Sequence, residues 1–263
     1  MRFGLIVGFA LLILPRVSAA ALEKITWVVD GVTREALVSV PAKIPAAGAP
    51  LVFAFHGHGG SMRQASQSFP IHEKWPAAIV VYPQGLPTVG QITDKNGDAA
   101  GWQPKAGVEG DRDLKFFDAM LADLRKRYAV DAKRIYATGH SNGGGFTYLL
   151  WAERGDVFAA MAPSSAVLSR EAGATKLKPK PVFHVASPQD ELVKFAWQER
   201  MINWDLKLNG CGSFNKDAMG YTLYPSSTGH NDVGIYLHTG GHRYPSAEAP
   251  DLIVKFFQAH PAP

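Results

Sequence analysis

The segment Arg134-Ile135-Tyr136-Ala137-Thr138-Gly139-His140-Ser141-Asn142-Gly143-Gly144 decides how this chain is interpreted. Its first five residues are an apolar run typical of a buried strand, and Gly139 to Gly143 match the pattern Gly-x-Ser-x-Gly. In a chain with 26 glycines that pattern alone is weak. Here it joins a predicted strand to a predicted helix over residues 143–153, and in that setting it indicates a tight turn that exposes a reactive serine.

The turn constrains the residues around Ser141. A tight strand-to-helix turn forces the serine into a strained backbone conformation, and small neighbours such as Gly139 and Gly143 prevent clashes. The helix that follows directs its free N–H groups and the positive end of its dipole toward the serine. The sequence therefore predicts a nucleophile beside an anion-stabilising helix terminus.

Strands and helices alternate through the centre of the chain, which predicts an α/β fold with a mostly parallel central sheet and helices on both faces. The helix at 113–128 has acidic residues at its start, basic residues at its end and apolar residues at helical spacing. The Gly- and Pro-rich connection at 83–110 is long enough to be either functional or disordered. Strands are expected at 25–29, 34–40, 51–55, 78–82, 134–138, 158–162, 181–186, 219–224 and 234–237, and further helices at 63–74, 143–153, 193–208 and 249–259.

The first twenty residues differ from the rest. Arg2 precedes an apolar run that Pro15 ends, and Ser18-Ala19-Ala20 offers small residues for cleavage. This pattern predicts a signal peptide over 1–20 and a secreted or periplasmic protein, with a membrane anchor as the alternative. The other residues, 21–263, are expected to form a single catalytic domain without stable membrane association.

Charge and cysteine content exclude some classes of function. The first twenty residues hold two Arg and no acid, so removing them leaves 25 basic and 23 acidic residues, without a concentrated basic patch. Nucleic-acid binding is not expected from such a balance. Cys211 is the single cysteine, so no internal disulfide can form; it is either a buried, inert thiol or pairs between chains.

A serine needs a base to take its proton and an acid to orient that base. Asp190 and His242 each follow a predicted strand, and the carboxyl ends of parallel strands lie at one edge of a sheet. The order Ser141, Asp190, His242 is the order found in α/β-hydrolases. His230 is the alternative base. Glu191, Asp205 and His184 are weaker candidates. Glu191 is predicted to start the next helix, Asp205 to lie within that helix and His184 to lie within a strand.

An acyl-transfer site also needs two N–H donors for the developing oxyanion. The backbone N–H of Asn142, directly after the nucleophile, is one candidate. The backbone N–H of His58, in a glycine-rich loop after the strand at 51–55, is the other. Trp102 lies in the long connection, where it either shapes the acyl pocket or packs in the core.

The chain resembles the α/β-hydrolases of the polyhydroxybutyrate depolymerase and feruloyl esterase group. This group is similar to a family of carbohydrate esterases. The resemblance implies ester hydrolysis through an acyl-enzyme, with no metal and no cofactor, on hydroxycinnamoyl (feruloyl) or hydroxyalkanoate esters, in soluble or polymeric form. The segments that carry it are 55–61, Gly101-Trp102-Gln103-Pro104, 113–117, 130–136, 139–144, Ser187-Pro188-Gln189-Asp190, Trp204 with Asn209-Gly210-Cys211, and Gly240-Gly241-His242.

Two features depart from the resemblance. The group often pairs the cysteine of Asn-Gly-Cys with one about fifteen residues later, where this chain has Tyr224-Pro225-Ser226-Ser227. It also often has Trp-Pro after the histidine, where this chain has Arg243-Tyr244-Pro245. The loop near Cys211 and the leaving-group side of the site are therefore expected to differ.

Three other interpretations stay open. His56-x-His58 resembles half of a zinc site, which would indicate a metallohydrolase. The fold could also belong to a non-catalytic binding protein. The same triad could serve other acyl chemistry, such as deacetylation, peptide hydrolysis or acyl transfer.

Overall fold

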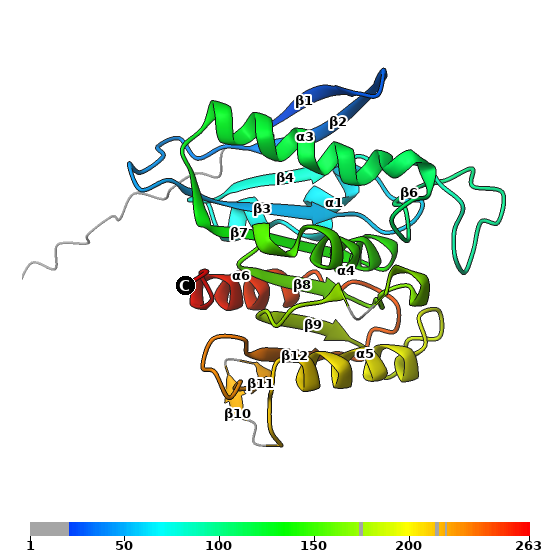
Figure 1. The fold of residues 1–263 in the computed structure, drawn as a ribbon, viewed down its shortest axis with the longest axis vertical. Helices are drawn as coiled ribbons and strands as arrows, with labels where there is room; N and C mark the ends of the chain where they lie inside the picture. The colour runs from blue at the N-terminus through cyan, green and yellow to red at the C-terminus, as the bar shows by residue number, and fades with distance from the viewer. Residues whose placement is uncertain (1–20, 174–175, 214–215, 219) are drawn as a thin grey trace, which may run out of the picture.

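The structure is a computed structural model that describes residues 21–173, 176–213, 216–218 and 220–263 (Figure 1). The predicted signal peptide, 1–20, lies outside these described residues. The strands of the main sheet are β1 (Leu22–Val29), β2 (Val32–Ser39), β3 (Ala49–Phe55), β4 (Ile79–Pro83), β7 (Val130–His140), β8 (Ala160–Ser164), β9 (Val182–Ala186), β10 (Lys216–Ala218), β11 (Tyr221–Tyr224) and β12 (Val233–Leu237).

Ten strands of the described chain pair into one sheet, in the order β1-β2-β4-β3-β7-β8-β9-β12-β11-β10. From β4 to β12 the neighbours are parallel, whereas the strands at both edges pair antiparallel. The predicted antiparallel start and mostly parallel centre are confirmed. Because the central strands are parallel, β7, β9 and β12 all end at the same edge, which is where Ser141, Asp190 and His242 follow them.

Helices cover both faces of the sheet, as predicted (Figure 1). Buried residues of α3, α4 and α5 belong to one apolar cluster, and buried residues of α1, α2 and α6 belong to a second cluster on the opposite face. The helices are α1 (Met62–Ser68), α2 (Ile71–Lys74), α3 (Arg112–Arg127), α4 (Asn142–Arg154), α5 (Phe195–Leu208) and α6 (Ala249–Ala259).

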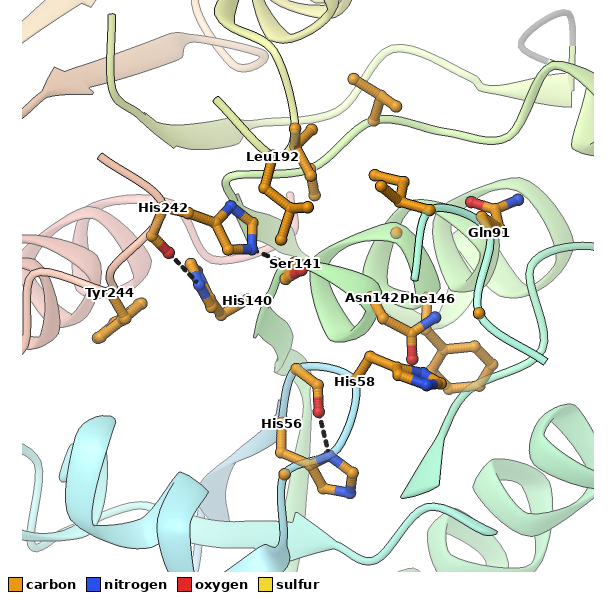
Figure 2. Close-up of a pocket in the computed structure, with 18 of the residues that line it drawn as sticks. His56, His58, Gln91, His140, Ser141, Asn142, Phe146, Leu192, His242 and Tyr244 are labelled. Atoms are coloured by element: carbon orange, nitrogen blue, oxygen red, sulfur yellow. Dashed lines mark hydrogen bonds between the residues drawn. The ribbon is translucent and has the colours of Figure 1, made fainter. Parts of the chain in front are cut away.

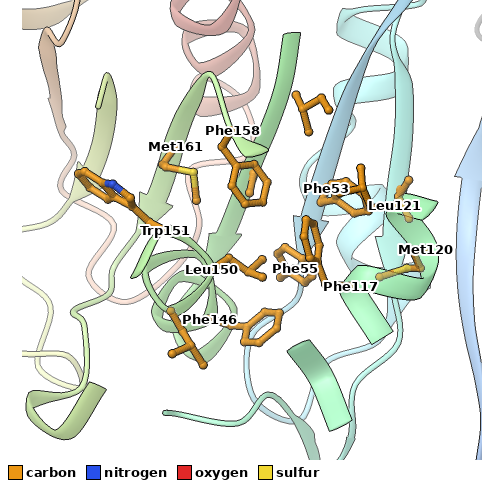
Figure 3. Packing of buried hydrophobic residues seen from close by; sticks show 14 of the residues in the cluster. Phe53, Phe55, Phe117, Met120, Leu121, Phe146, Leu150, Trp151, Phe158 and Met161 are labelled. Atoms are coloured by element: carbon orange, nitrogen blue, oxygen red, sulfur yellow. The ribbon is translucent and has the colours of Figure 1, made fainter. Parts of the chain in front are cut away.

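Strand β3 shows how the sheet supports both layers. Phe53 and Phe55 pack edge-to-face against Phe117 of α3 and Phe146 of α4, as Figure 3 shows. The alternate residues of β3, such as Val52, belong to the opposite cluster. Since successive side chains of a strand point to opposite faces, a continuous apolar run is needed to fill both layers.

One predicted helix, at 63–74, is in fact two. Phe69 has φ −119° and ψ 64°, outside the helical region, and Pro70 follows it. A proline disfavours helical geometry in the residue before it and supplies no N–H of its own. The chain therefore ends α1 at Ser68 and begins α2 at Ile71.

The long connection at 83–110 is ordered. It carries a short hairpin of β5 (Leu86–Pro87) and β6 (Ala100–Gly101). The Asp94 carboxylate accepts hydrogen bonds from the backbone N–H groups of Gly97, Asp98 and Ala99. The hydrogen bond from Ala99 lowers the pKa of Asp94 most, and that from the His58 ring comes second. With the bonds from Gly97 and Asp98, they bring this pKa to about 2. The connection is thus tied to the loop that follows β3.

In the described part of the chain, none of the helices has the length and apolar character needed to cross a membrane.

Candidate active site

Ser141 occupies a strained turn between β7 and α4. Its φ is 56° and its ψ is −120°, a region that non-glycine residues rarely adopt. Such strain costs on the order of 1–3 kcal/mol and persists only where the surrounding structure enforces it. The strained backbone predicted for this serine is confirmed.

The two glycines beside Ser141 are required by close backbone packing. A Cβ added to Gly139 would lie 2.4 Å from the carbonyl oxygen of Gly143, and one added to Gly143 would lie 2.3 Å from that of Phe55. Both distances are shorter than any real contact. Helix α4 can therefore approach β3 and β7 closely only because these positions lack side chains.

The structure brings Ser141, His242 and Asp190 together. Figure 2 shows the first two, with the His242 ring facing Ser141. The Oγ of Ser141 lies 2.9 Å from the Nε2 of His242. The Nδ1 of His242 lies 2.9 Å from the Oδ2 and 3.1 Å from the Oδ1 of Asp190. A carboxylate accepts only, so Nδ1 carries the proton and Nε2 is free to accept the serine hydroxyl proton.

The carboxylate of Asp190 is buried and held from several sides. Its Oδ1 accepts hydrogen bonds from the backbone N–H groups of Leu192 and Val193, and its Oδ2 accepts one from the Nε2 of Gln198. A buried carboxylate needs such hydrogen-bond donors, because burial removes its contact with water. Asp190 is thereby fixed in place to orient the imidazole of His242.

His140 also contacts His242, and the sequence did not identify it as part of the site. Its Nε2–H donates to the backbone oxygen of His242 at 2.9 Å, and the two rings lie 5.0 Å apart (Figure 2). Burial, assisted by the nearby His242, lowers the pKa of His140 to about 3, so its ring is neutral. The position of His140 at the end of β7 was a signal that it reaches the same sheet edge, but nothing in the sequence pointed to its partner.

The rival candidates lie elsewhere. His230 is exposed and is not among the residues that line the cavity described below. The Oη of Tyr148 donates to Asp205 at 2.7 Å and lies 2.8 Å from the Nδ1 of His184, forming a buried chain between α4, α5 and β9. Burial raises the pKa of Asp205 to about 8 and lowers that of His184 to about 3. These two groups are therefore neutral core residues near pH 7.

The loop after β3 lies against the nucleophile. A Cβ built on Gly57 would be 3.5 Å from the Cβ of Ser141, which places the adjoining His58 peptide beside the serine. As the first residue of α4, Asn142 has an N–H without a carbonyl partner within the helix. Both predicted oxyanion donors thus belong to segments next to Ser141.

Trp102 does not line the cavity, so the predicted direct role in the acyl pocket is wrong. The side chain is 1% exposed, its Nε1 donates to the backbone oxygen of His56, and its ring stacks on Phe146. The side chain of Asn142 binds both the N–H and the carbonyl of Trp102. Trp102 is a core residue that connects the β3 loop to α4, the alternative that the sequence had left open.

The His56-x-His58 pair is used in hydrogen bonds. The Nε2 of His56 accepts from the backbone N–H of Gly85, and its Nδ1 lies 2.7 Å from the carbonyl of Gly57. The Nε2 of His58 lies 2.8 Å from Asp94. His56 therefore has no ring nitrogen left for a metal, and the described residues contain no cluster of three or more His, Cys, Asp or Glu suited to hold an ion.

A cavity of about 940 Å³ opens above Ser141 and His242. Its walls combine apolar and aromatic side chains with a few polar groups, which is typical of sites for small organic molecules. The β3 loop, α4, the segment after β8, α5 and the His242 loop all contribute. Among the lining residues are Phe69, Gln91, Ile92, Phe146, Val167, Leu192, Trp197, Met201, Trp204 and Tyr244.

Sequence comparisons relate the chain to known enzymes. Residues 106–203 match the model of the prolyl oligopeptidase family. The chain is 27% identical, over 85% of its length, to the bifunctional acetylxylan esterase/xylanase XynS20E of Neocallimastix patriciarum, of which it spans only 33%. It is 28% identical, over 80% of its length, to probable feruloyl esterase C of Aspergillus clavatus, of which it spans 77%.

Solved structures share the fold at low sequence identity. The acetyl xylan esterase from Aspergillus awamori superposes with a TM-score of 0.66 at 14% identity, covering 91% of this chain and 99% of that one. The feruloyl esterase module from Clostridium thermocellum, complexed with sinapinate, gives a TM-score of 0.63 at 13% identity, covering 92% and 88%. The chain has the α/β-hydrolase fold. Within that fold, its predicted resemblance to the group that includes feruloyl and acetylxylan esterases is confirmed.

Proposed function

We propose that the chain is a serine carboxylic-ester hydrolase in which Ser141 is the nucleophile, His242 the general base and Asp190 the group that orients it. The observation that carries the proposal is the continuous hydrogen-bonded path from Ser141 through His242 to the buried carboxylate of Asp190. The esterase names of the relatives support the same reaction class.

The reaction follows from this geometry. His242 Nε2 takes the proton of Ser141 as Oγ attacks the ester carbonyl, and Asp190 stabilises the imidazolium that forms. The backbone N–H groups of His58 and Asn142 bind the oxyanion, each worth about 3 kcal/mol of the barrier. His242 then gives its proton to the leaving alcohol, and water releases the acyl group by the reverse sequence.

We propose hydroxycinnamoyl or hydroxyalkanoate esters as substrates, and export to the periplasm or the exterior. Apolar and aromatic walls around Ser141 favour an apolar acyl group. The N-terminal sequence pattern supports export. Hydrolysis of methyl ferulate, hydroxybutyrate oligomers and p-nitrophenyl esters by the mature protein distinguishes these substrates, and Ser141→Ala is expected to lose the activity while keeping its fold by circular dichroism.

Peptide hydrolysis is the second candidate, favoured by the match of residues 106–203 to the prolyl oligopeptidase family. The matched segment contains the strand, turn and helix around Ser141, which many acyl hydrolases share. Peptide p-nitroanilides in the same panel separate the two reactions. Turnover of peptides but not of esters would replace the esterase proposal.

A further inference from the structure

The charged residues that line the cavity are all of one sign. Arg170, Arg200 and Arg243 line it, and no Asp, Glu or Lys is among its lining residues. A guanidinium offers five N–H donors and no acceptor, so these side chains can only donate to a ligand. They belong to three separate segments, after β8, on α5 and after His242, so each of these segments brings a positive charge to the cavity wall.

No ion pair joins any of these three arginines to an acidic side chain that the structure describes; the side chain of Glu171, next to Arg170, is not among those described. Other arginines of the same structure form ion pairs: Arg127 pairs with Asp123 at 2.8 Å, and Arg154 pairs with Asp118 at 2.8 Å. A cleft lined by unbalanced charge of one sign raises the local concentration of oppositely charged ligands. The arginines at the cavity are therefore free to bind an anion.

Arg200 lies next to large apolar side chains on α5. Trp197, Arg200 and Trp204 follow each other at helical spacing on the face of α5 that lines the cavity. Trp204 is 40% exposed, and Leu192, labelled near Ser141 in Figure 2, is 37% exposed. Within the cavity these apolar side chains offer a packing surface beside the charge of Arg200, a combination typical of sites for small organic ligands.

We propose that the site prefers esters that carry a free carboxylate attached to an apolar body, with the carboxylate bound by Arg170, Arg200 and Arg243 and the apolar body packed on the tryptophans of α5. The inference rests on the proposed ester hydrolysis and narrows its substrate class. Arginine suits this role because its planar fork of N–H donors matches a carboxylate.

Two matched ester pairs test the preference, one for each side of the scissile bond. The acyl pair is the mono-p-nitrophenyl ester of glutaric acid and its terminal carboxamide. The alcohol pair is the acetate ester of 4-(2-carboxyethyl)phenol and its carboxamide. Each pair differs only in whether the terminal group is a carboxylate or a carboxamide. The rate without enzyme is subtracted for each ester, because the glutarate carboxylate attacks its own ester. The measured quantity is the ratio of kcat/KM for acid over amide.

The wild-type protein is expected to favour the acid by roughly five- to tenfold in at least one pair at low ionic strength, since exposed ion pairs are individually weak but three of them can act on one carboxylate. Salt should reduce the ratio, because it screens exposed charges. The triple variant Arg170→Gln, Arg200→Gln, Arg243→Gln should bring the ratio close to one.

The control variant carries Arg125→Gln, Lys126→Gln and Lys255→Gln, which remove the same charge from exposed sites outside the cavity. It should keep the wild-type ratio. Ratios near one for both pairs in the wild type, or an equal loss of the ratio in the control, would overturn the inference while leaving ester hydrolysis intact. Absence of turnover of all four esters would instead refute the proposed function on which it rests.

Discussion

His140 shows how much a residue beside the nucleophile can contribute without touching the reacting atoms. Its N–H holds the backbone of His242 from one side, while Asp190 holds the ring from the other. The general base is thus fixed both as a side chain and as part of a loop. The neutral state of His140 keeps a second positive charge away from the imidazolium that forms during catalysis.

Replacing His140 by phenylalanine tests this positioning role. The variant keeps an aromatic ring but removes the N–H donor to His242, a loss of about 0.5–1.5 kcal/mol for a typical hydrogen bond. We expect kcat for a p-nitrophenyl ester to fall roughly tenfold, with KM changed much less. His140→Gln, which can still donate, should recover part of the rate. An unchanged kcat in the phenylalanine variant would contradict the role.

The raised pKa of Asp205 predicts that the free energy of unfolding depends on pH. Its folded-state pKa, about 8, lies above the ordinary value of 3.8 because the side chain is buried. Between these values the folded chain keeps a proton that the unfolded chain has released, so rising pH favours unfolding. Asp205→Asn removes this proton and keeps an acceptor for the hydroxyl of Tyr148. The wild type is therefore expected to lose unfolding free energy between pH 5 and pH 7.5, whereas the variant should not. Urea titrations at both pH values measure the difference in unfolding free energy between variant and wild type, which should grow with pH. A difference that stays constant would argue against a raised pKa.

At the scale of elements, the contact of α4 with the sheet depends on Gly143. Gly143→Ala would place a methyl group against the carbonyl oxygens of Phe55 and His56, at 2.3 and 2.4 Å. We expect it to lose about 1–3 kcal/mol of unfolding free energy, as for an overpacked core. Gly145, in the same helix, has only the carbonyl of Val167 near its added Cβ, at 3.5 Å.

Gly145→Ala is the matched control, since it gains helix propensity of up to about 1 kcal/mol without a clash. Chemical denaturation of both variants decides the comparison. If the two alanines have the same effect on stability, then close packing does not explain the glycine at 143.

Helices and strands could be predicted where a local sequence pattern determines them. They were harder to predict where contacts between distant segments determine the structure. Apolar runs identified β3 and β7, and strand ends brought Ser141, Asp190 and His242 to one edge. The break at Phe69-Pro70 was missed in the predicted helix at 63–74, although Pro70 was a local signal for it, because proline constrains the residue before it. The burial of Trp102 was not visible, since the fold of its long loop depends on Asn142 and His56, far away in the chain.

At the scale of the whole molecule, the position of Cys211 indicates where a disulfide could stabilise the fold. Cys211 is free and forms an isolated antiparallel bridge with Ser226, the position where the resemblance leads one to expect a second cysteine. The N–H of Ser227 donates to the carbonyl of Gly210, so Cys211 and Ser226 are a pair without hydrogen bonds between them. Such pairs have closely spaced Cα atoms, within the range of a disulfide.

Ser226→Cys is therefore expected to form a disulfide with Cys211 and to raise stability by up to about 3 kcal/mol, as for a loop of about fifteen residues. The rise in Tm should disappear when a reducing agent is added. Ser227→Cys is the control, because the neighbouring residue of a strand faces the other way. A thiol count of two in oxidised Ser226→Cys would contradict the predicted geometry.

The central claim is that the hydrogen-bonded path through His242 makes one particular serine, Ser141, reactive. Fluorophosphonate labelling with intact-mass detection and peptide mapping tests it most directly. We expect a single adduct on Ser141, no adduct in Ser141→Ala, and strongly slowed labelling in His242→Gln. Labelling of the wild type at another residue, or at an unchanged rate in His242→Gln, would contradict the account.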